Sequence, residues 1–584
     1  MSPALVTFFC FLGYTAAYFL YARFLARRVF RLDQAAVTPA HALADGVDYV
    51  PTNRYVLFGH HYASIAGLSP MLGPAVAVIW GWLPALIWVV VGTAFIGGVH
   101  DFAALVLSIR ARGMSIGKVA EDIMGPRAKT LFHIIIFFLV ALAMGVFVYV
   151  VADLFTSAYH PEAVGPTFSL MILALIMGWL IYRKGFRIAP LTASAFVLML
   201  ILVWVGMDVP VGGVSNEIWS CILLAYAFLA SVLPVWMLLQ PRDYLNSLLL
   251  YLGVGLMFGG FFLLGPSFQA PAIDLSPQGA PPIFPFVFIT IACGAISGFH
   301  GLVSSGTTAK QIDRETDATF IGYGGMVGES LLGLSAVLAT TTGFASAGAW
   351  AAHYRDWAVA QQLSANLGAF IDGAGLFISQ FGVPLETGRS FMAIVAIAFA
   401  LTSLDTAARL LRFNITEIGQ TLNVPALKNR ALAAALAIGA IAFFTFFRID
   451  GRPAGLTLWQ LFGTTNQILG GLTLLAASLY LLQKHRPAVY TLLPMAFMML
   501  TTLSAMVAKI RDFFAAWMAR GALGSLLLLL LGALLFGLSV WLSVEAVVRF
   551  IQFRRGTLPP LRLGASQGTG STPPGSPPPA GPPA

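Results

Sequence analysis

Apolar runs follow one another along almost the whole chain, with short clusters of polar and charged residues between them. A helix needs about 20 mostly apolar residues to cross the ~30 Å hydrocarbon core of a bilayer, and about fifteen runs meet this requirement. The runs begin near Pro3, His60, Leu83, Thr130, Thr167, Ile188, Trp219, Leu245, Ile283, Gly322, Gly388, Arg430, Trp459, Val489 and Ala522. This pattern predicts an all-α polytopic membrane protein with about fifteen transmembrane spans.

Composition supports the same class and argues against others. Of the 584 residues 58% are hydrophobic and 10% are charged, and the mean hydropathy is +0.84, values that soluble globular chains of this size do not reach. The net charge of +9 is divided among short clusters between apolar runs, so we expect a lipid bilayer and no nucleic acid as partner. The three cysteines lie far apart without C-x-x-C spacing, which gives disulfide or zinc frameworks little support. A metal cluster of His60, His61, His100 and His300 is the alternative, but the sequence offers no His spacing characteristic of a metal-binding helix, so we expect no metal site and no cofactor.

The basic residues predict the orientation of the chain. The first apolar run, Pro3 to Ala22, is followed by four arginines, so residues 1–31 are expected to form an anchor with the N-terminus outside. All but seven of the 33 Lys and Arg residues then fall on the cytoplasmic side. The seven that fall outside are Arg355, Arg389, Arg448, Arg452, Lys509, Arg511 and Arg520. We therefore expect a cytoplasmic C-terminus.

Loop composition divides the chain further. We expect a transporter core over residues 53–480, with external segments at 265–282 and 345–386, and further spans over residues 489–555. The end of the chain, residues 556–584, is rich in Pro, Gly and Ser and is expected to be a disordered tail.

The second span carries helix-breaking residues in an apolar setting. Gly67, Pro70, Gly73 and Pro74 follow each other closely, and Pro removes a helical N–H and clashes with the preceding turn. We therefore expect a broken helix near residues 67–74. Irregular backbone at membrane depth survives only inside protein or beside a water-filled cavity, and transporters place ligand sites at such breaks.

Polar side chains beside this break are candidate substrate ligands. His60, His61, Ser64 and Ser69 lie next to it, where imidazole and hydroxyl groups can bind a carboxylate. The alternative is that they only cap helices and satisfy buried carbonyls.

A similar but weaker pattern of His, hydroxyl and Gly residues surrounds His300 in the ninth span. By the predicted topology the second and ninth spans run in opposite directions, as inverted repeats require. We place the repeats at spans two to six and nine to thirteen, with spans seven and eight inserted. The alternative is an uninterrupted five-plus-five arrangement, because span seven also carries a proline, Pro234. Hydroxyl and amide side chains here and near the thirteenth span either wrap a substrate or a sodium ion or bond back to their own helices. The candidates are His300, Ser304, Ser305, Thr307, Thr308, Thr464 and Asn466.

Ionisable residues within spans are functional candidates by default. His100, Asp101 and Glu329 are expected to carry coupling protons, because desolvation favours the neutral form of a carboxyl group; the alternative is a structural hydrogen-bond network. Asp405 and Arg409 share a helix face at a cytoplasmic end and are interpreted as a gate or a structural ion pair. Lys310 belongs to this gate or is a flanking cytoplasmic lysine.

Several long strings resemble the carbon starvation protein A (CstA) family of bacterial membrane proteins. They are NRYVLFGHHYASIAG (53–67), GGVHDF (97–102), SIRARGMSIG (108–117), SGFHGLVSSGTTAKQ (297–311), TSLDTAARLLRF (402–413) and LFGTTNQILGG (461–471). The resemblance implies a secondary transporter of the inner membrane that is induced when carbon is scarce, with peptides or pyruvate as substrates and proton coupling. It also implies a five-plus-five inverted-repeat core like that of amino-acid/polyamine/organocation transporters. The longer family members continue beyond the point where this chain has its Pro-rich tail.

The residues leave rival functions open. A sodium-coupled symporter, a membrane-embedded nutrient sensor and an intramembrane enzyme are the alternatives to proton-coupled uptake of pyruvate or short peptides. No P-loop pattern is present, so ATP drive within this chain has no support, and no catalytic residues are expected.

Overall fold

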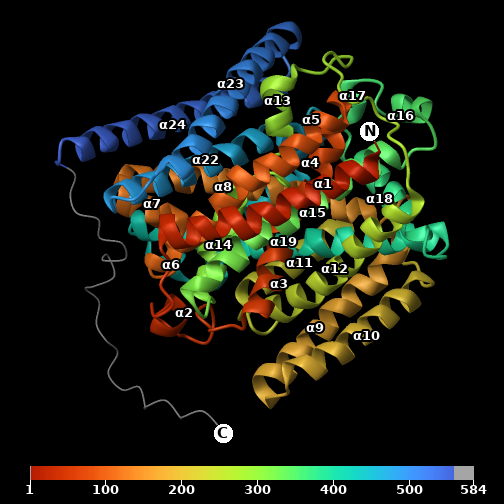
Figure 1. Ribbon diagram of the computed structural model, residues 1–584, viewed down its shortest axis with the longest axis horizontal. Coiled ribbons are helices and arrows are strands. Elements are labelled where there is room, and N and C mark those ends of the chain that lie inside the picture. Colours follow the sequence, from red (N-terminus) through yellow and green to blue (C-terminus); the bar gives the residue numbers. More distant parts are fainter. Residues whose placement is uncertain (1, 558–584) are drawn as a thin grey trace.

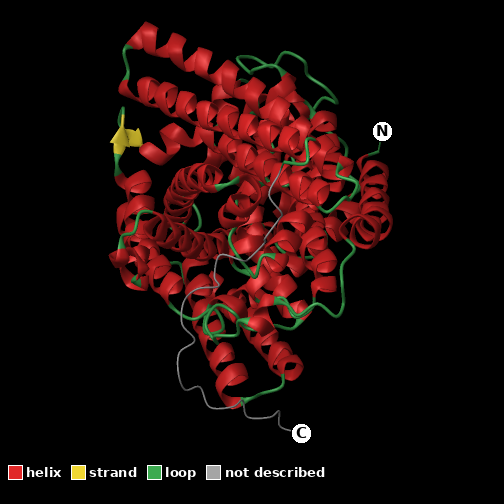
Figure 2. Ribbon diagram, turned by 90° about the vertical axis from the view of Figure 1, so that its left-hand side faces the viewer, coloured by secondary structure: helices red, strands yellow, loops and turns green. Residues whose placement is uncertain are grey.

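The structure is a computed structural model that describes residues 2–557, so the tail expected at 556–584 lies almost wholly outside the described residues. Almost every described element is a helix, and one two-residue strand pair stands apart from them (Figure 2). Helices α1 to α12 are α1 (Pro3–Ala16), α2 (Pro39–Ala42), α3 (Arg54–Ile65), α4 (Ser69–Ala77), α5 (Trp82–Ile87), α6 (Gly98–Arg110), α7 (Ile116–Met124), α8 (Pro126–Leu154), α9 (Val164–Lys184), α10 (Ile188–Met207), α11 (Asn216–Val232) and α12 (Leu239–Leu264). The later elements are α13 (Ile283–Thr290), α14 (Gly298–Gly306), α15 (Gly324–Thr342), α16 (Ala347–His353), α17 (Trp357–Ala360), α18 (Leu363–Ser379), α19 (Leu385–Thr421), α20 (Arg430–Phe446), β1 (Arg448–Ile449), β2 (Arg452–Pro453), α21 (Ala454–Leu458), α22 (Phe462–Gln483), α23 (Val489–Arg520) and α24 (Leu523–Arg554).

Among the described residues, 11 helices are long and apolar enough to cross a membrane, or up to 12 if the bent pair α3 and α4 is one span. The expected count of about fifteen is therefore not confirmed, although each expected span coincides with helical structure. The remaining three are α11 and α20, with 17 residues each, and the interrupted pair α13 and α14. At 1.5 Å per residue a 17-residue helix spans about 26 Å, which is shorter than the bilayer core.

The long helix α19 forms the centre of the bundle. Its apolar window is completely buried, and it packs against α8, α11, α12, α18 and α20. Close packing with α18 depends on small residues, since a Cβ at Gly388 would lie 2.9 Å from the carbonyl oxygen of Gly375.

Two helical hairpins lie at the edges of the bundle (Figure 1). Helices α9 and α10 pack mainly on each other, and α23 and α24 form the second hairpin. Only 17% of the apolar window of α10 is buried, so its outer face is left for lipid. Helices α11 and α12, the expected spans seven and eight, lie against α19, α8 and α3, whereas the α9–α10 hairpin is peripheral.

The expected external segment 345–386 is mostly helical, with α16, α17 and α18 in it. Asp356 caps α17 by accepting a hydrogen bond from the Val359 amide at 2.9 Å. Backbone hydrogen bonds to this residue hold the pKa of its exposed carboxyl below the usual value. The Trp357 amide donates to Gln278 in the other expected external loop at 2.9 Å, so the two loops are joined.

Candidate functional site

The helix break between α3 and α4 is confirmed, with a bend of 48°. It lies at Ala66–Leu68, slightly before the prolines, because Pro70 occupies the first turn of α4, where its missing N–H costs nothing. Pro74 sits inside α4 without ending it.

Hydroxyl groups of α19 satisfy carbonyls at this first break. Thr402 donates to the carbonyl oxygen of Ala63 at 2.9 Å, and Ser403 donates to that of Ser64 at 3.1 Å. A Cβ at Gly67 would lie 2.7 Å from the Ser403 hydroxyl oxygen, so glycine permits the close approach. The backbone carbonyl groups that the break frees from helical hydrogen bonds therefore have side-chain partners.

A second break separates α13 from α14 over residues 291–297. The indole of Trp88 donates to the carbonyl oxygen of Ile291 at 3.2 Å, and Thr93 donates to that of Gly294 at 3.2 Å. On the other side, the Asn466 side-chain oxygen accepts from the Phe299 amide at 2.9 Å and from the Ser297 hydroxyl at 3.2 Å. Asn466, a predicted substrate ligand, therefore supports the backbone of this break.

The two breaks lie side by side. A Cβ at Gly73 in α4 would come within 2.7 Å of the carbonyl oxygen of Thr290, and one at Gly294 within 3.6 Å of the Pro70 Cα. Transporters with two broken helices place their ligand between them, so this crossing is the candidate site.

Beside the second break, two histidines and two carboxylates form one buried chain, which we call the acid–imidazole chain: His100, Asp101, His300 and Glu329. His100 Nδ1 lies 2.7 Å from Asp101 Oδ1, and His300 Nδ1 lies 2.9 Å from Asp101 Oδ2. His300 Nε2 is 3.2 Å from Glu329 Oε2. All four side chains are fully buried. The three predicted proton-coupling residues thus meet in space, joined by His300.

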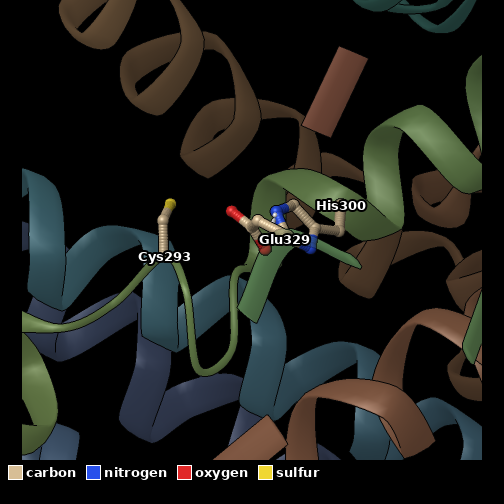
Figure 3. A group of neighbouring side chains, drawn as sticks. All are labelled: Cys293, His300 and Glu329. Atoms are coloured by element: carbon tan, nitrogen blue, oxygen red, sulfur yellow. Dashed lines mark ion pairs between the residues drawn. The ribbon is translucent and has the colours of Figure 1, made fainter. Parts of the chain in front are cut away.

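Figure 3 shows Cys293 facing His300 and Glu329 across the second break. One ligand atom from each of these residues lies within 4.8 Å of the others. Among the described residues, these three side chains form a group that could hold a metal ion. The imidazole already bridges two carboxylates, so the geometry fits proton exchange better than metal binding.

A second buried cluster, the arginine–carboxylate cluster, consists of Arg242, Asp243, Asp405, Tyr226 and His60. Arg242 pairs with Asp405 and with Asp243, the latter at 3.0 Å. Asp243 Oδ2 lies 2.6 Å from His60 Nδ1, and Tyr226 donates to Asp405 at 2.7 Å. Every charge in the cluster has an opposite partner, as burial in a membrane protein requires.

Sequence reasoning missed Arg242, Asp243 and Tyr226. The eighth span was expected to begin near Leu245, which left Arg242 and Asp243 in a loop, whereas α12 begins at Leu239 and carries both residues inside the bundle. The signal was present, because charged residues directly before an apolar run either flank the membrane or form a buried pair.

The expected ion pair within α19 does not form as such. Arg409 Nη1 donates to Asp48 Oδ1 at 2.9 Å and Nη2 donates to the Ala230 carbonyl oxygen at 3.0 Å, while Asp405 pairs with α12 and α11. Lys310 lies over the rings of Phe413, at 4.0 Å, and Tyr49, at 5.5 Å. The helical spacing was right, but partners on other elements compete better than an i, i+4 neighbour.

Asp48 lies in the loop before α3. Burial disfavours its charge, but Arg409 and then Lys310, Arg412 and Arg430 outweigh burial and hold the pKa of the Asp48 carboxyl below its usual value. The Arg409–Asp48 contact is therefore an ion pair at neutral pH.

Most remaining candidate ligands bond within the protein. His61 Nδ1 lies 2.9 Å from the Thr308 hydroxyl oxygen. Ser305, Thr307 and Thr464 donate to carbonyl oxygens of their own helical segments at 2.7, 3.0 and 2.9 Å. Ser64 Oγ lies 3.0 Å from Thr406 Oγ1. Ser304 is buried, and its hydroxyl has no described partner.

A cavity of about 1320 Å³ reaches the crossing of the two breaks. Ser69, Gly73, Thr290 and Cys293 line its inner part. Its other walls include residues of the expected external segments, such as Ala280 and Trp357, Gln361, Gln362 and Ser364, and residues of the β1–β2 hairpin and α23. Of the predicted substrate ligands, Ser69 faces this cavity.

Comparison with known proteins adds an independent line of evidence. The family model described as carbon starvation protein CstA matches residues 2–352 and 349–505. The peptide transporter CstA of Campylobacter jejuni is 33% identical over 561 residues, which cover 86% of this chain and 79% of that protein. The pyruvate/proton symporter BtsT of Escherichia coli is 30% identical over 579 residues, covering 85% and 80%.

Among solved structures, the nucleobase-cation-symport-1 family transporter Mhp1, in a closed conformation with bromovinylhydantoin bound, aligns with a TM-score of 0.48 and 13% identity. The alignment covers 90% of this chain and 98% of that chain.

Proposed function

Since the chain belongs to the carbon starvation protein CstA family, we propose that it is a secondary active transporter that takes up pyruvate or short peptides with protons across the inner membrane of a bacterium. Relatives named as a peptide transporter and as a pyruvate/proton symporter support both substrate classes. The observation that carries the proposal is a cavity that ends at two crossed helix breaks, next to a buried chain of titratable groups.

The core is a five-plus-five inverted repeat. One repeat comprises α3/α4, α5–α6, α8, α11 and α12, and the other comprises α13/α14, α15, α19, α20 and α22. Equivalent contacts support this layout: α4 packs on α15 as α14 packs on α6, and α3 packs on α12 as α13 packs on α22. Inserting the two-span hairpin α9–α10 keeps the repeats in opposite directions, as the expected insertion of spans seven and eight also did.

The described conformation is open to the outside and closed to the cytoplasm. By the predicted topology, with the N-terminus outside, the cavity walls belong to external segments. Arg409–Asp48 lies toward the cytoplasmic ends of its elements, and the arginine–carboxylate cluster closes the bundle behind the first break. Alternating access requires these inner contacts to separate while the outer cavity closes.

Substrate binds at the inner end of the cavity, beside Ser69 and Cys293. The proton is carried by the acid–imidazole chain, in which the Glu329 carboxylate pairs with His300 beside the second break. An uncompensated change of charge there is costly, so protonation of the chain and movement of the neighbouring break are coupled.

Uptake of labelled pyruvate and of a labelled dipeptide into proteoliposomes tests the proposal. An inward proton gradient is expected to drive accumulation of one of these substrates above equilibrium, and a protonophore is expected to abolish it. Accumulation that follows a sodium gradient at constant pH would show that sodium, and not the proton, is the coupling ion. Equilibration of the substrate without accumulation would refute secondary active transport.

A further inference from the structure

Three of the seven basic residues that depart from the cytoplasmic bias of the chain come together at one place. Arg448 and Arg452, on the β1–β2 hairpin, and Lys509, on α23, all line the outer part of the cavity. Asp512 is the acidic residue among the lining residues. The cavity mouth therefore carries an excess of positive charge.

Two of these cations form no close ion pair among the described residues, although Asp512 attracts the Lys509 ammonium from a greater distance. Among the described residues, no carboxylate lies within ion-pair distance of Lys509 or Arg452, whereas Arg448 is 3.7 Å from Glu217 and Asp512 is 3.8 Å from Arg511. Lys509 donates instead to the carbonyl oxygen of Gln460 and lies 5.9 Å from the centre of the Phe286 ring.

A cation in a partly desolvated cavity is stabilised by an anion, because the opposite charge replaces lost hydration. A lysine bonded to one carbonyl keeps N–H groups for another acceptor, since its ammonium has three donors. Carboxylates make short charge-assisted hydrogen bonds with such donors.

We propose that the outer part of the cavity is a capture site for the carboxylate of the substrate, held by Lys509 with Arg452 lining the same cavity, before the substrate moves inward to the helix breaks. This inference rests on the proposed function and adds a recognition rule to it. The shared chemistry is one carboxylate, which is either that of pyruvate or the C-terminus of a peptide.

Carboxylate recognition predicts which molecules compete. Pyruvate or a free-acid dipeptide is expected to inhibit uptake, whereas pyruvamide or the C-terminally amidated dipeptide inhibits poorly. Lys509→Gln is expected to raise KM for the acid by about tenfold, the value of one hydrogen bond to a charged group, with little change in maximal rate. Lys509→Gln is expected to leave the weak inhibition by pyruvamide or the amidated dipeptide unchanged. Lys509→Arg is expected to keep most of the affinity. Comparison of the pyruvate assay with the dipeptide assay shows which carboxylate is recognised.

Arg520→Gln is the matched control. Arg520 ends the same helix α23 and is exposed, and it is not among the residues that line the cavity. It removes the same charge and is expected to leave KM unchanged. An unchanged KM in Lys509→Gln, or an equal rise in Arg520→Gln, overturns the capture site while wild-type uptake still supports the transport function.

A second measurement does not depend on transport. Gln361 is exposed and lines the cavity, so Gln361→Cys offers a thiol there. An anionic methanethiosulfonate reagent is expected to modify position 361 faster than a cationic one, measured by mass spectrometry of the purified chain. Lys509→Gln and added salt are expected to reduce this preference, because salt screens exposed charges. Faster modification by the cation overturns the proposal. A preserved anion preference in a protein that takes up neither substrate keeps the anion site and refutes the transport function.

Discussion

The Arg409 guanidinium on the central helix α19 donates to the Asp48 carboxylate in the loop before α3 at 2.9 Å, and its side chain is almost fully buried. Asp48→Asn keeps the shape of this contact but removes the charge that compensates Arg409. We expect the inner side to open more often, so that preloaded substrate leaks from proteoliposomes several-fold faster without a gradient. Efflux of labelled substrate measures this change.

The exposed His41–Asp313 contact offers the control for that experiment. Both side chains are 40% exposed or more, and such pairs contribute little. Asp313→Asn is expected to leave efflux unchanged. Equal leakage from both variants would show that Asp48 is no gate.

The lowered pKa of Asp48 gives this ion pair a pH dependence with a definite sign. A carboxyl whose folded pKa is depressed stabilises the native state above its unfolded pKa of about 3.9, and the contribution disappears as the pH falls through the folded value. The difference in melting temperature between wild type and Asp48→Asn is therefore expected to stay constant from pH 8 to pH 5. A difference that already vanishes near pH 6 would contradict the pairing.

Asp101→Asn is expected to abolish gradient-driven accumulation, whereas substrate binding is weakened less. Asp101 Oδ1 and Oδ2 contact the two imidazoles of His100 and His300, and Asn keeps the shape while removing titration. The measurements are substrate affinity in detergent and uptake driven by a pH gradient, both normalised to folded protein. Wild-type uptake with unchanged pH dependence in the variant would exclude Asp101 as proton carrier.

Arg242 lies between two carboxylates inside the bundle, so its loss leaves buried charge without compensation. Arg242→Met is expected to destabilise the protein by about 3 to 5 kcal/mol, the cost of breaking a buried pair from one side. Thermal unfolding in detergent measures the effect, and the exposed Arg187 supplies the control Arg187→Met. A shift in melting temperature no larger than that of the control would show that Arg242 is in contact with water and that its loss leaves no buried charge uncompensated.

Glycine at the second break is required by backbone contacts. A Cβ at Gly298 would lie 2.2 Å from the Asn466 carbonyl oxygen and 2.6 Å from the Gly470 amide nitrogen. Gly298→Ala is therefore expected to destabilise the protein by about 1 to 3 kcal/mol through overpacking. Gly439, inside α20, has open space around it, and Gly439→Ala is expected to be neutral or slightly stabilising. Similar melting temperatures for the two variants would contradict the packing.

Cys293 reports on access to the breaks. Cys293 and Cys10 are both 6% exposed, but Cys293 lines the cavity, whereas Cys10 lies in α1 and is not among the lining residues. An uncharged, membrane-impermeant thiol reagent added outside is expected to modify Cys293, and saturating substrate is expected to slow the reaction several-fold. Labelling of Cys293 only from the cytoplasmic side would reverse the assigned conformation.

Local chemistry explains what the sequence could predict. Gly67 and Pro70 act on their own backbone, so a broken helix at this place follows from their covalent structure. The placement of Asp101 and Glu329 in apolar runs likewise marked them as buried titratable groups. The hydrophobic pattern also placed helical structure at each expected run, but it could not separate a 17-residue helix such as α11 from a longer one. It also left the largely buried helix α18 in an expected external segment.

Pairing between distant segments is what the sequence could not show. His60 contacts Asp243 across 183 positions, and Arg409 contacts Asp48 across 361. Nothing near either residue specifies these partners, because several arrangements of the same spans satisfy the hydrophobic pattern equally well. The peripheral position of the α9–α10 hairpin is likewise a result of packing that the hydrophobic pattern does not specify.

The hydrogen bonds that support the two breaks have a mechanical consequence. Thr402 and Ser403 fasten the first break to α19, whereas Asn466 fastens the second to α22. The second break is also bonded to Trp88 and Thr93, so it is held on two sides. Where the two breaks meet, Gly73 presents no side chain to the carbonyl of Thr290, so any side chain at position 73 would push the two breaks apart.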